Sequence, residues 1–325
     1  MEKLRVGVMG LGGIFHRVMA DFQKAENCEL YAVAARDGAR AQDAVARYGA
    51  KRAFGSYAEM LECPEVELVY IATPHSLHRE HALTCLAHGK HVLCEKAFAL
   101  NDSQAREMVR AARANGLFLM EAMWTRCLPA MRALKQMADA GTFVEIRHIT
   151  ANFGYAAAFD PNSRIYAPEL AGGALLDVGI YPLSITAMLL GAEPAEVQSA
   201  CVMAPSGVDA RTVAQLSYAS GATAQFFCAV DTAGDSRMTV YGTAARVEIP
   251  DFWHATQFTV HRGGEAQLHS FPPENEGHHH QFIHAAECIR AGKTESPLMP
   301  LDETVALMRI MTQMRQANGF LYPVE

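Results

Sequence analysis

The first third of the chain alternates short apolar or β-branched runs with segments of helical periodicity. Helical spacing of apolar residues marks segments such as 41–48 and 78–89, the second closed by Gly89. The runs predicted as strands are 4–9, 29–35, 66–72, 91–95 and 117–121. This alternation predicts βαβ units and a doubly wound parallel sheet covered on both faces.

After residue 123 the pattern changes to successive apolar runs with turn residues between them and little helix. It predicts a mostly antiparallel open sheet. Its expected elements are a helix at 129–140, strands at 145–153, 212–219 and 223–230, an inserted helical region near 171–190, and helices near 278–291 and 302–317. The fold class is therefore an α/β Rossmann domain, 1–122, followed by an α+β open-sheet domain, 123–325, whose last helix can pack back on the first domain.

Length and composition narrow the class of protein. A chain of 325 residues, half of them hydrophobic, has material for two domains. Its net charge of −7 argues against nucleic-acid partners, and no uninterrupted apolar stretch reaches the roughly 18 residues that span a bilayer. Residues 1–8 run directly into a strand pattern, without an export signal, and the eight cysteines contain no C-x-x-C pair. We expect free thiols, a cytoplasmic location, no membrane partner and a small-molecule substrate.

A glycine-rich turn, GLGGIF at residues 10–15, follows the first strand and opens a helix. In a dinucleotide fingerprint, Gly10 would permit the tight turn, and Gly12 would let the backbone approach a pyrophosphate at the helix start. Phe15 stands where the third small residue is usual. The residues predicted to contact a dinucleotide here are Gly10, Gly12, Gly13, Ile14 and Phe15.

The end of the second strand bears on the choice of cofactor. An acidic residue at this place usually holds the ribose 2′-hydroxyl of NAD, but the run AVAARD (32–37) offers Arg36. A guanidinium suits the 2′-phosphate of NADP. Asp37 would serve NAD if the register shifted by one residue, and Arg36 could also be a solvated loop charge. We expect NADP, with NAD as the alternative.

Two further pairs of residues suggest chemistry. Glu95 and Lys96 lie at the carboxyl end of the strand 91–95, where ligands bind in open parallel sheets. Asp177 and Tyr181 are four residues apart in GGALLDVGIYP, so they share one face of a helix. Alone, an aspartate and a tyrosine on a helix are more often cap and core than catalyst.

Together these motifs resemble the glucose-fructose oxidoreductase/inositol dehydrogenase/rhizopine catabolism (GFO/IDH/MocA) family of two-domain NAD(P)-dependent oxidoreductases. The resemblance covers nearly the whole chain. Within the family, the chain resembles the branch of dimeric dihydrodiol dehydrogenases and related aldose dehydrogenases. The residues that carry this resemblance are Tyr181 and the stretches AVAARD and GLFLMEAMWTR. The marks are the glycine turn, Ile71-Ala72-Thr73-Pro74 followed by His78, Cys94-Glu95-Lys96, residues 121–126, and Asp177-x-Gly179-x-Tyr181.

The resemblance implies roles for the two pairs. Lys96 and Tyr181 would face the substrate, Lys96 lowering the phenol pKa and holding the substrate oxygen while Tyr181 exchanges the proton. Asp177 would orient the substrate or the lysine. Glu95 would fix the strand end or the cofactor. Ala97 replaces the family's proline, so the backbone after Lys96 loses a φ restraint, a cis bond becomes doubtful, and the lysine is expected to be held less firmly.

Histidines near these motifs leave alternatives open. The resemblance places Thr73, Pro74 and His78 at the cofactor, and His75 and His78 fit either a nicotinamide or substrate contact or a pair at a helix start. The cluster His278–His280 invites a metal site. No cysteine or carboxylate set is spaced with it, and hydride transfer to nicotinamide needs no metal, so we expect none and interpret it as a helix start.

Aromatic residues suggest the substrate class. By resemblance to the dihydrodiol dehydrogenase branch, Trp124, Phe153 and Trp253 line a pocket whose ring faces suit a cyclic polyol, an aldose or a vicinal diol. Arg126, also placed at the substrate, and Arg164 could instead clamp the carboxylate of a hydroxy acid.

Two other functions remain possible: a redox-neutral glycoside-cleaving enzyme of the same family, and a non-catalytic cofactor sensor. Lys96 and Tyr181 argue against the sensor. A homodimer is expected through the open face of the second sheet, to which the alternation on 223–230 assigns Phe226, Cys228 and Val230.

Overall fold

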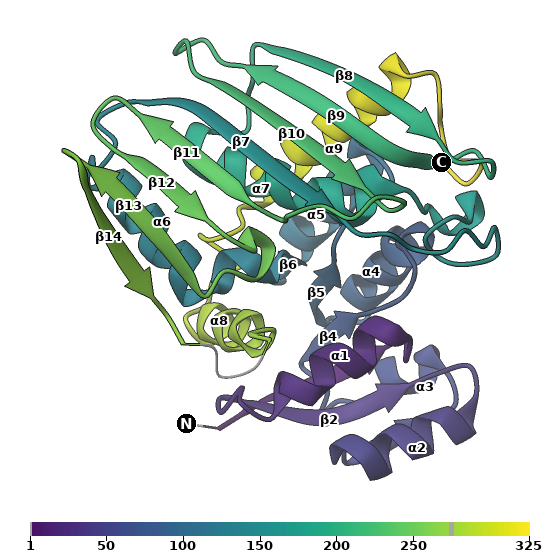
Figure 1. Ribbon diagram of the computed structural model, residues 1–325. Helices are drawn as coiled ribbons and strands as arrows, with labels where there is room; N and C mark the ends of the chain where they lie inside the picture. Colours follow the sequence, from purple (N-terminus) through teal and green to yellow (C-terminus); the bar gives the residue numbers. More distant parts are fainter. Residues whose placement is uncertain (1, 273–275) are drawn as a thin grey trace. The chain divides into compact units, whose positions relative to one another are not determined.

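The computed structural model describes residues 2–272 and 276–325 and divides the chain into two compact units (Figure 1). Each unit is assembled from segments that are distant in the sequence. The first comprises Met1–Ala99, Ser103–Trp124 and Asn275–Thr304, and the second comprises Leu100–Asp102, Thr125–Glu274 and Val305–Glu325.

The first unit is built on a six-stranded parallel sheet in the order β3-β2-β1-β4-β5-β6. Its strands are β1 Leu4–Met9, β2 Cys28–Ala34, β3 Arg52–Phe54, β4 Leu68–Ile71, β5 His91–Glu95 and β6 Leu119–Ala122. Its helices are α1 Gly13–Phe22, α2 Gly38–Tyr48, α3 Tyr57–Leu61, η1 His75–Leu77, α4 His78–Ala87, α5 Asp102–Asn115, which begins at the boundary of the unit, and α8 His279–Arg290.

This sheet confirms the predicted doubly wound domain. All four residues of β4 are buried, as are Val92–Glu95 of β5, which explains why these runs are continuously apolar up to their ends. Strand order reverses between β1 and β4. In sheets of this kind ligands bind beyond the carboxyl ends of the strands at such a switch point.

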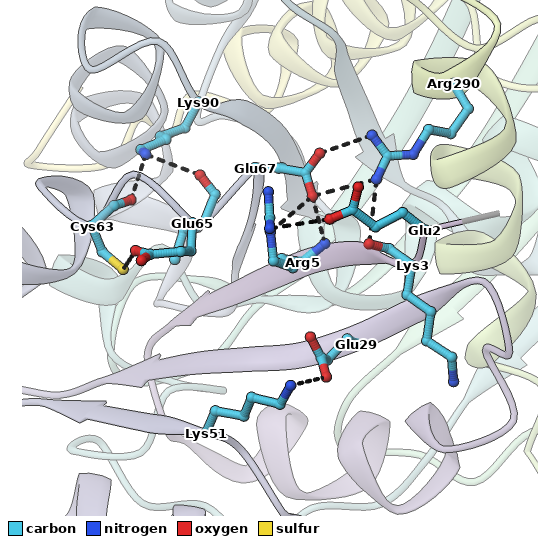
Figure 2. A network of polar contacts seen from close by, with 11 residues as sticks. Glu2, Lys3, Arg5, Glu29, Lys51, Cys63, Glu65, Glu67, Lys90 and Arg290 are labelled. Carbon is cyan, nitrogen blue, oxygen red and sulfur yellow. Dashed lines mark hydrogen bonds and ion pairs between the residues drawn. The ribbon is translucent and has the colours of Figure 1, made fainter.

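An ion-pair network explains why α8 belongs to the first unit (Figure 2). Arg290, at the end of α8, donates to Glu67 Oε1 at 2.8 Å and to the carbonyl of Lys3. Glu67 also pairs with Arg5 of β1, at 3.3 Å. Nearby, Lys90 is buried and donates to the carbonyls of Cys63 and Val66, at 2.7 and 2.9 Å. The contacts of Arg290 with Glu67 and Lys3 link the end of α8 to the start of the first strand.

The second unit is built on an eight-stranded sheet in the order β14-β13-β12-β11-β7-β10-β9-β8, antiparallel except between β7 and β10. Its strands are β7 Ile146–Gly154, β8 Glu196–Met203, β9 Asp209–Ser217, β10 Thr223–Ala229, β11 Met238–Gly242, β12 Arg246–Ile249, β13 Gln257–Arg262 and β14 Glu265–Ser270. Its helical segments are η2 Trp124–Cys127, which starts at the boundary, α6 Pro129–Asp139, η3 Pro168–Leu170, η4 Leu175–Gly179, α7 Ile180–Leu190, η5 Phe252–His254 and most of α9 Leu301–Ala317. The mostly antiparallel sheet was predicted.

Helices cover one face of this sheet. Figure 1 shows α7 and α9 behind β7–β10, and the side chains of Phe226 and Cys228 on β10 are buried on the covered face, as is Val230 just beyond the strand. The expectation that these three residues lie on the open face is therefore wrong. The opposite face carries Val213, which is 49% exposed, and Phe227, and it is hollowed by about 510 Å³. The predicted alternation of side chains on β10 was right, but the residues expected on the open face are those on the covered face.

The segment Pro168–Leu190 is long and apolar enough to cross a bilayer, but 83% of its most apolar window is buried within the protein. Most of this segment, which contains η3, η4 and α7, therefore belongs to the core of the second unit.

Candidate active site

The glycine turn lies between β1 and α1, at the switch point of the sheet. Gly10 has φ +96°, and a Cβ there would lie 2.8 Å from the carbonyl oxygen of Ala72, so only glycine fits. A Cβ on Gly12 or Gly13 would meet no atom of the described residues within 4 Å. The turn therefore presents open backbone.

The first turn of α1 suits an anion. Gly12 is its N-cap, no side chain caps the N–H groups, and the turn contains no acidic residue. Ile14 is half-buried, whereas Phe15 is fully buried and packs edge-on against Tyr48, at 5.3 Å between ring centroids. The aromatic ring at the third fingerprint position thus supports the helix from the core side. The open backbone at Gly12 and Gly13 fits a dinucleotide pyrophosphate, whereas the buried Phe15 side chain does not face such a ligand, contrary to expectation.

Arg36 and Asp37, which the sequence left as alternatives, have different roles. Asp37 is the N-cap of α2, and its Oδ1 accepts a hydrogen bond from the N–H of Ala39 at 2.9 Å. Arg36 is exposed just past β2 and forms no ion pair within the described part of the chain. Burial lowers the pKa of His81, and the nearby charge of Arg36 also lowers it. Burial raises the pKa of Tyr57, and the charge of Arg36 opposes that rise. The free charge at the strand end is therefore positive.

Glu95 and Lys96 occupy the carboxyl end of β5. Glu95 is only 4% exposed and accepts a hydrogen bond from the hydroxyl of Tyr70, so its carboxylate fixes the strand end. Lys96 is half-buried. The Lys96–Ala97 peptide bond is cis, so replacing the family's proline by alanine has not removed the cis geometry.

Two histidines hold the backbone around Lys96. His75 Nε2 contacts the carbonyl oxygen of Lys96 at 3.1 Å, and His78 Nδ1 contacts that of Ala97 at 2.9 Å. His78 Nε2 also lies 2.9 Å from the Thr73 carbonyl, but burial, with the charge of His75, lowers the pKa of His78 to about 3. The neutral ring has one N–H, so it donates to one of these carbonyls at a time.

His75 and His78 are the first residues of η1 and α4, so the alternative of a pair at a helix start is confirmed, and the contacts with the carbonyls give both rings a further use. His78 is fully buried and faces the protein interior. The buried Glu121 of β6 adds a third contact, because its Oε1 accepts a hydrogen bond from the N–H of Phe98 at 3.2 Å. The loop after Lys96 is thus held at three successive residues. Thr73 and Pro74 lie between β4 and η1, and the Thr73 hydroxyl bonds His81 at 3.0 Å.

In the second unit, Asp177 lies in a π-helical turn, η4, which runs directly into α7 at Ile180. Such turns are frequent at functional sites. Asp177 is 4% exposed, and both its oxygens are engaged: Oδ1 accepts from Arg164 at 3.0 Å and Oδ2 from the hydroxyl of Tyr155 at 2.5 Å. The Asp177 charge raises the pKa of Arg164, and burial, with that charge, raises the pKa of Tyr155.

Tyr181 follows on the first turn of α7, and the residue is 6% exposed. It packs edge-on against Phe153 at the end of β7, at 5.3 Å between centroids. Phe153 in turn stacks on Trp253 at 5.3 Å and 17°, and Trp253 is half-buried. Arg164 lies close enough to Tyr181 for their charges to interact. Tyr181 therefore sits between an aromatic stack and the Asp177 cluster.

Two residues that the sequence analysis placed at the substrate, Trp124 and Arg126, are almost completely buried. Arg126 is 2% exposed and donates from Nε to the Ser184 hydroxyl at 2.8 Å, which braces α7. Trp124, in the first unit, is 2% exposed and stacks on His278 at 4.2 Å. His278 is the N-cap of α8, so the histidine cluster is a helix start, as interpreted from the sequence. The roles of Trp124 and Arg126 toward a substrate stay predictions.

The sequence did not identify Tyr155 as a functional candidate, and it named Arg164 only as an alternative carboxylate clamp. Neither is in a motif or at a helical spacing from Asp177. The one sequence feature that could have pointed to Tyr155 was its position two residues after the end of the predicted strand 145–153.

Comparisons with known proteins agree with this arrangement. Residues 4–123 match the model of an oxidoreductase family with an NAD-binding Rossmann fold, and residues 131–248 match the GFO/IDH/MocA C-terminal domain. The trans-1,2-dihydrobenzene-1,2-diol dehydrogenase of Mus musculus is 36% identical over 334 residues, which cover 98% of each chain.

Among solved structures, the aldose-aldose oxidoreductase from Caulobacter crescentus has a TM-score of 0.88, is 26% identical and covers 98% of both chains. A 3-ketoreductase from Actinomadura kijaniata, in complex with NADP, has a TM-score of 0.85 at 26% identity, covering 97% of this chain and 98% of its own. The chain thus belongs to the GFO/IDH/MocA family of NAD(P)-dependent oxidoreductases.

Proposed function

We propose that this protein is an NADP-preferring dehydrogenase that interconverts a carbinol and a carbonyl on a cyclic polyol, an aldose or a vicinal diol. The observation that carries the proposal is Tyr181, a phenol between the Phe153–Trp253 stack and the cluster that Asp177 forms with Arg164 and Tyr155. Relatives named for a dihydrobenzene diol and for aldoses support this substrate class.

The first unit would bind the cofactor. The open glycine turn and the uncapped start of α1 fit the pyrophosphate, and Arg36 fits a 2′-phosphate because Asp37 is engaged as a helix cap. When bound, the nicotinamide accepts or supplies the hydride at the carbinol carbon. Thr73, Pro74, Glu95 and Lys96, at the carboxyl ends of β4 and β5, complete the proposed cofactor residues.

Tyr181 would exchange the proton of the substrate hydroxyl. A free phenol, with pKa about 10, is a poor base near neutrality, so it needs a positive charge nearby. Lys96 is proposed to supply that charge and to hold the substrate oxygen. The two residues belong to different units, and their action on one substrate is our proposal.

Asp177 is proposed to orient the substrate indirectly. Both of its oxygens accept hydrogen bonds within the second unit, so its carboxylate fixes Arg164 and the hydroxyl of Tyr155. The Arg164 side chain is 60% exposed and can bond a substrate hydroxyl. This arrangement favours Asp177 acting through these two side chains.

A ring substrate fits better than an open-chain hydroxy acid. A carboxylate clamp needs a free guanidinium. Arg126 is buried against Ser184, and the charge of Arg164 is compensated by Asp177. The exposed part of Trp253, stacked on Phe153, offers an aromatic face to the apolar side of a ring.

We also propose a cytoplasmic homodimer that associates through the open face of the second sheet. The hollow on that face is lined by Val213 and Phe227 among glutamines and small residues. None of the eight cysteines, all of which the structure describes, forms a disulfide, which suits a reducing compartment.

The test is a screen of NADP and NAD reduction, followed by absorbance, with aldoses, inositols, vicinal cyclic diols and short hydroxy acids. We expect turnover with a ring substrate and NADP. Faster turnover of the hydroxy acids would overturn the substrate class. Product formation from a glycoside without net absorbance change would favour the redox-neutral alternative, and cofactor binding without turnover of any compound would favour a sensor.

A further inference from the structure

A group of buried polar side chains lies next to the Asp177 segment and has no part in the chemistry proposed above. Asp209, Arg315 and Tyr322 are 0%, 0% and 4% exposed, and all three belong to the second unit. Burying charges is costly unless their bonds are put to use. Each of the three binds a backbone atom near a proposed catalytic residue.

Asp209, the first residue of β9, binds the start of the π-helical turn. Its Oδ2 accepts hydrogen bonds from the N–H of Leu175 at 2.8 Å and from the Thr212 hydroxyl at 2.7 Å. Leu175 is two residues before Asp177. The carboxylate therefore satisfies an N–H group at the beginning of the helical segment, where the intrahelical partner is missing.

The contact requires glycine beside it. Gly173 has φ +109°, and a Cβ on it would lie 2.3 Å from Asp209 Oδ1, so any side chain would displace the carboxylate. Burial raises the pKa of Asp209 to about 7, while its bonds with Thr212 and Leu175 and the charge of Arg315 oppose the rise. The titratable groups close enough for their charges to interact with Asp209 are Arg315 of α9, Cys201 of β8, Cys228 of β10 and Tyr322.

The C-terminal tail binds the residue before this glycine. The hydroxyl of Tyr322 donates to the carbonyl of Gly172 at 2.7 Å, and the Arg315 guanidinium lies over the Tyr322 ring at 4.7 Å. Arg315 also pairs with Glu325 and donates to the carbonyl of Leu100 at 2.6 Å. Leu100 is four residues after Lys96 in the chain.

We propose that Asp209 and Tyr322 are positioning residues that hold the backbone of residues 172–175, and thereby set the places of Asp177 and Tyr181. Arg315 supports both through the Tyr322 ring and the tail. The claim rests on the proposed function, because it assigns these contacts to the turnover step. A merely structural role would change the stability of the second unit without changing turnover of the folded enzyme.

The experiment compares Tyr322→Phe and Asp209→Asn with a control, Thr312→Val, which removes a buried hydroxyl that donates to the Met308 carbonyl within α9. Tyr322→Phe keeps the ring under Arg315, so it tests the proposal even if Asp209→Asn fails to fold. Three measurements are made on folded protein: steady-state kinetics with NADP and the best ring substrate, the Kd for NADP, and amide hydrogen exchange of residues 172–181.

We expect Tyr322→Phe and Asp209→Asn each to lower kcat about 10-fold and to raise exchange in 172–181 about 10-fold, because a lost bond to a positioned group costs on this order. The Kd for NADP should stay within about twofold, since the glycine turn is in the other unit, and Thr312→Val should change neither quantity. Unchanged exchange in 172–181, or raised exchange with unchanged kcat, would overturn the proposal.

Failure of the proposed function has a different signature. It would appear as a wild-type enzyme that binds NADP but turns over no ring substrate. The exchange data would then test the backbone contacts alone: unchanged exchange in Tyr322→Phe rejects the proposal, and faster exchange confined to 172–181 supports the part of it that concerns the hold on residues 172–175.

Discussion

The hydroxyl of Tyr155 donates a hydrogen bond to Asp177, whose other carboxylate oxygen accepts one from Arg164. Tyr155→Phe removes the first bond and keeps the ring. We expect kcat/KM for a ring substrate to fall about 10-fold, because a hydrogen bond to a charged group contributes about 1.5–3 kcal/mol. Steady-state kinetics measure it, and Tyr241→Phe, on the exposed part of β11, is the control. An unchanged kcat/KM would mean that the Tyr155 hydroxyl is not needed to hold Asp177.

Arg36 should decide the cofactor preference. Arg36→Ala is expected to raise the Kd for NADP at least about 10-fold while the Kd for NAD changes little, because only NADP has the phosphate that the guanidinium would bind. Titration of both cofactors at fixed salt measures this. Arg47→Ala, which removes the same charge from an exposed position on α2, should leave both Kd values nearly unchanged. Tighter binding of NAD than NADP by the wild type would contradict the assignment.

His78 should make stability depend on pH. Its pKa is lowered from 6.5 to about 3 in the folded protein, so the unfolded chain takes up the proton first as the pH falls. Stability is therefore present above about 6.5 and is lost as the pH falls towards 3. The Tm of the wild type should fall between pH 7 and pH 5 by more than that of His78→Gln, which cannot titrate. Parallel Tm curves would show that His78 is not neutral in the fold.

The fold was largely predictable because each sheet has its own periodicity. Continuous apolar runs identified the parallel strands, and period-two runs identified the antiparallel ones. Which face of β10 is covered was not predictable. A period of two separates Phe226 from Phe227, but the packing of η4 and α7, which are distant in sequence, decides which of them is buried.

The site was predictable where it follows from local backbone. The glycine turn could be identified from its place after the first strand, whereas the roles predicted for Asp177 and Tyr181 came from the family resemblance, because such a pair on a helix is more often cap and core. Tyr155, Asp209 and Tyr322 could not, because their bonds to Asp177, Leu175 and Gly172 join segments that no short-range pattern relates. The cis bond at Lys96–Ala97 was likewise hidden by the absence of proline.

The open sheet face should mediate the proposed dimer. Val213→Arg places a charge in the hollow and is expected to shift the protein from dimer to monomer at micromolar concentration, because an unpaired charge in an interface is costly. Light scattering after size exclusion measures it. Leu268→Arg, at an exposed position on β14 outside the residues that line the hollow, is the control. A wild-type protein that is monomeric would reject the dimer.

Lys96 is the second proposed catalytic group. Lys96→Met keeps the length of the side chain but removes its charge, so we expect turnover to fall at least about 100-fold. The contacts of His75 and His78 with the backbone carbonyls do not involve the ammonium, so the loop should keep its shape. Circular dichroism checks the fold, and NADP titration checks that cofactor still binds. Turnover close to that of the wild type would remove Lys96 from the mechanism.

The central claim is that Tyr181 exchanges the proton during hydride transfer, and the turnover of Tyr181→Phe tests it most directly. The phenylalanine keeps the ring packed against Phe153, so only the hydroxyl is lost. The measurement is kcat for NADP reduction with the best ring substrate, with the Kd of NADP determined alongside. We predict a loss in kcat of at least about 100-fold with an unchanged Kd. A kcat within a few-fold of the wild type would show that another group moves the proton.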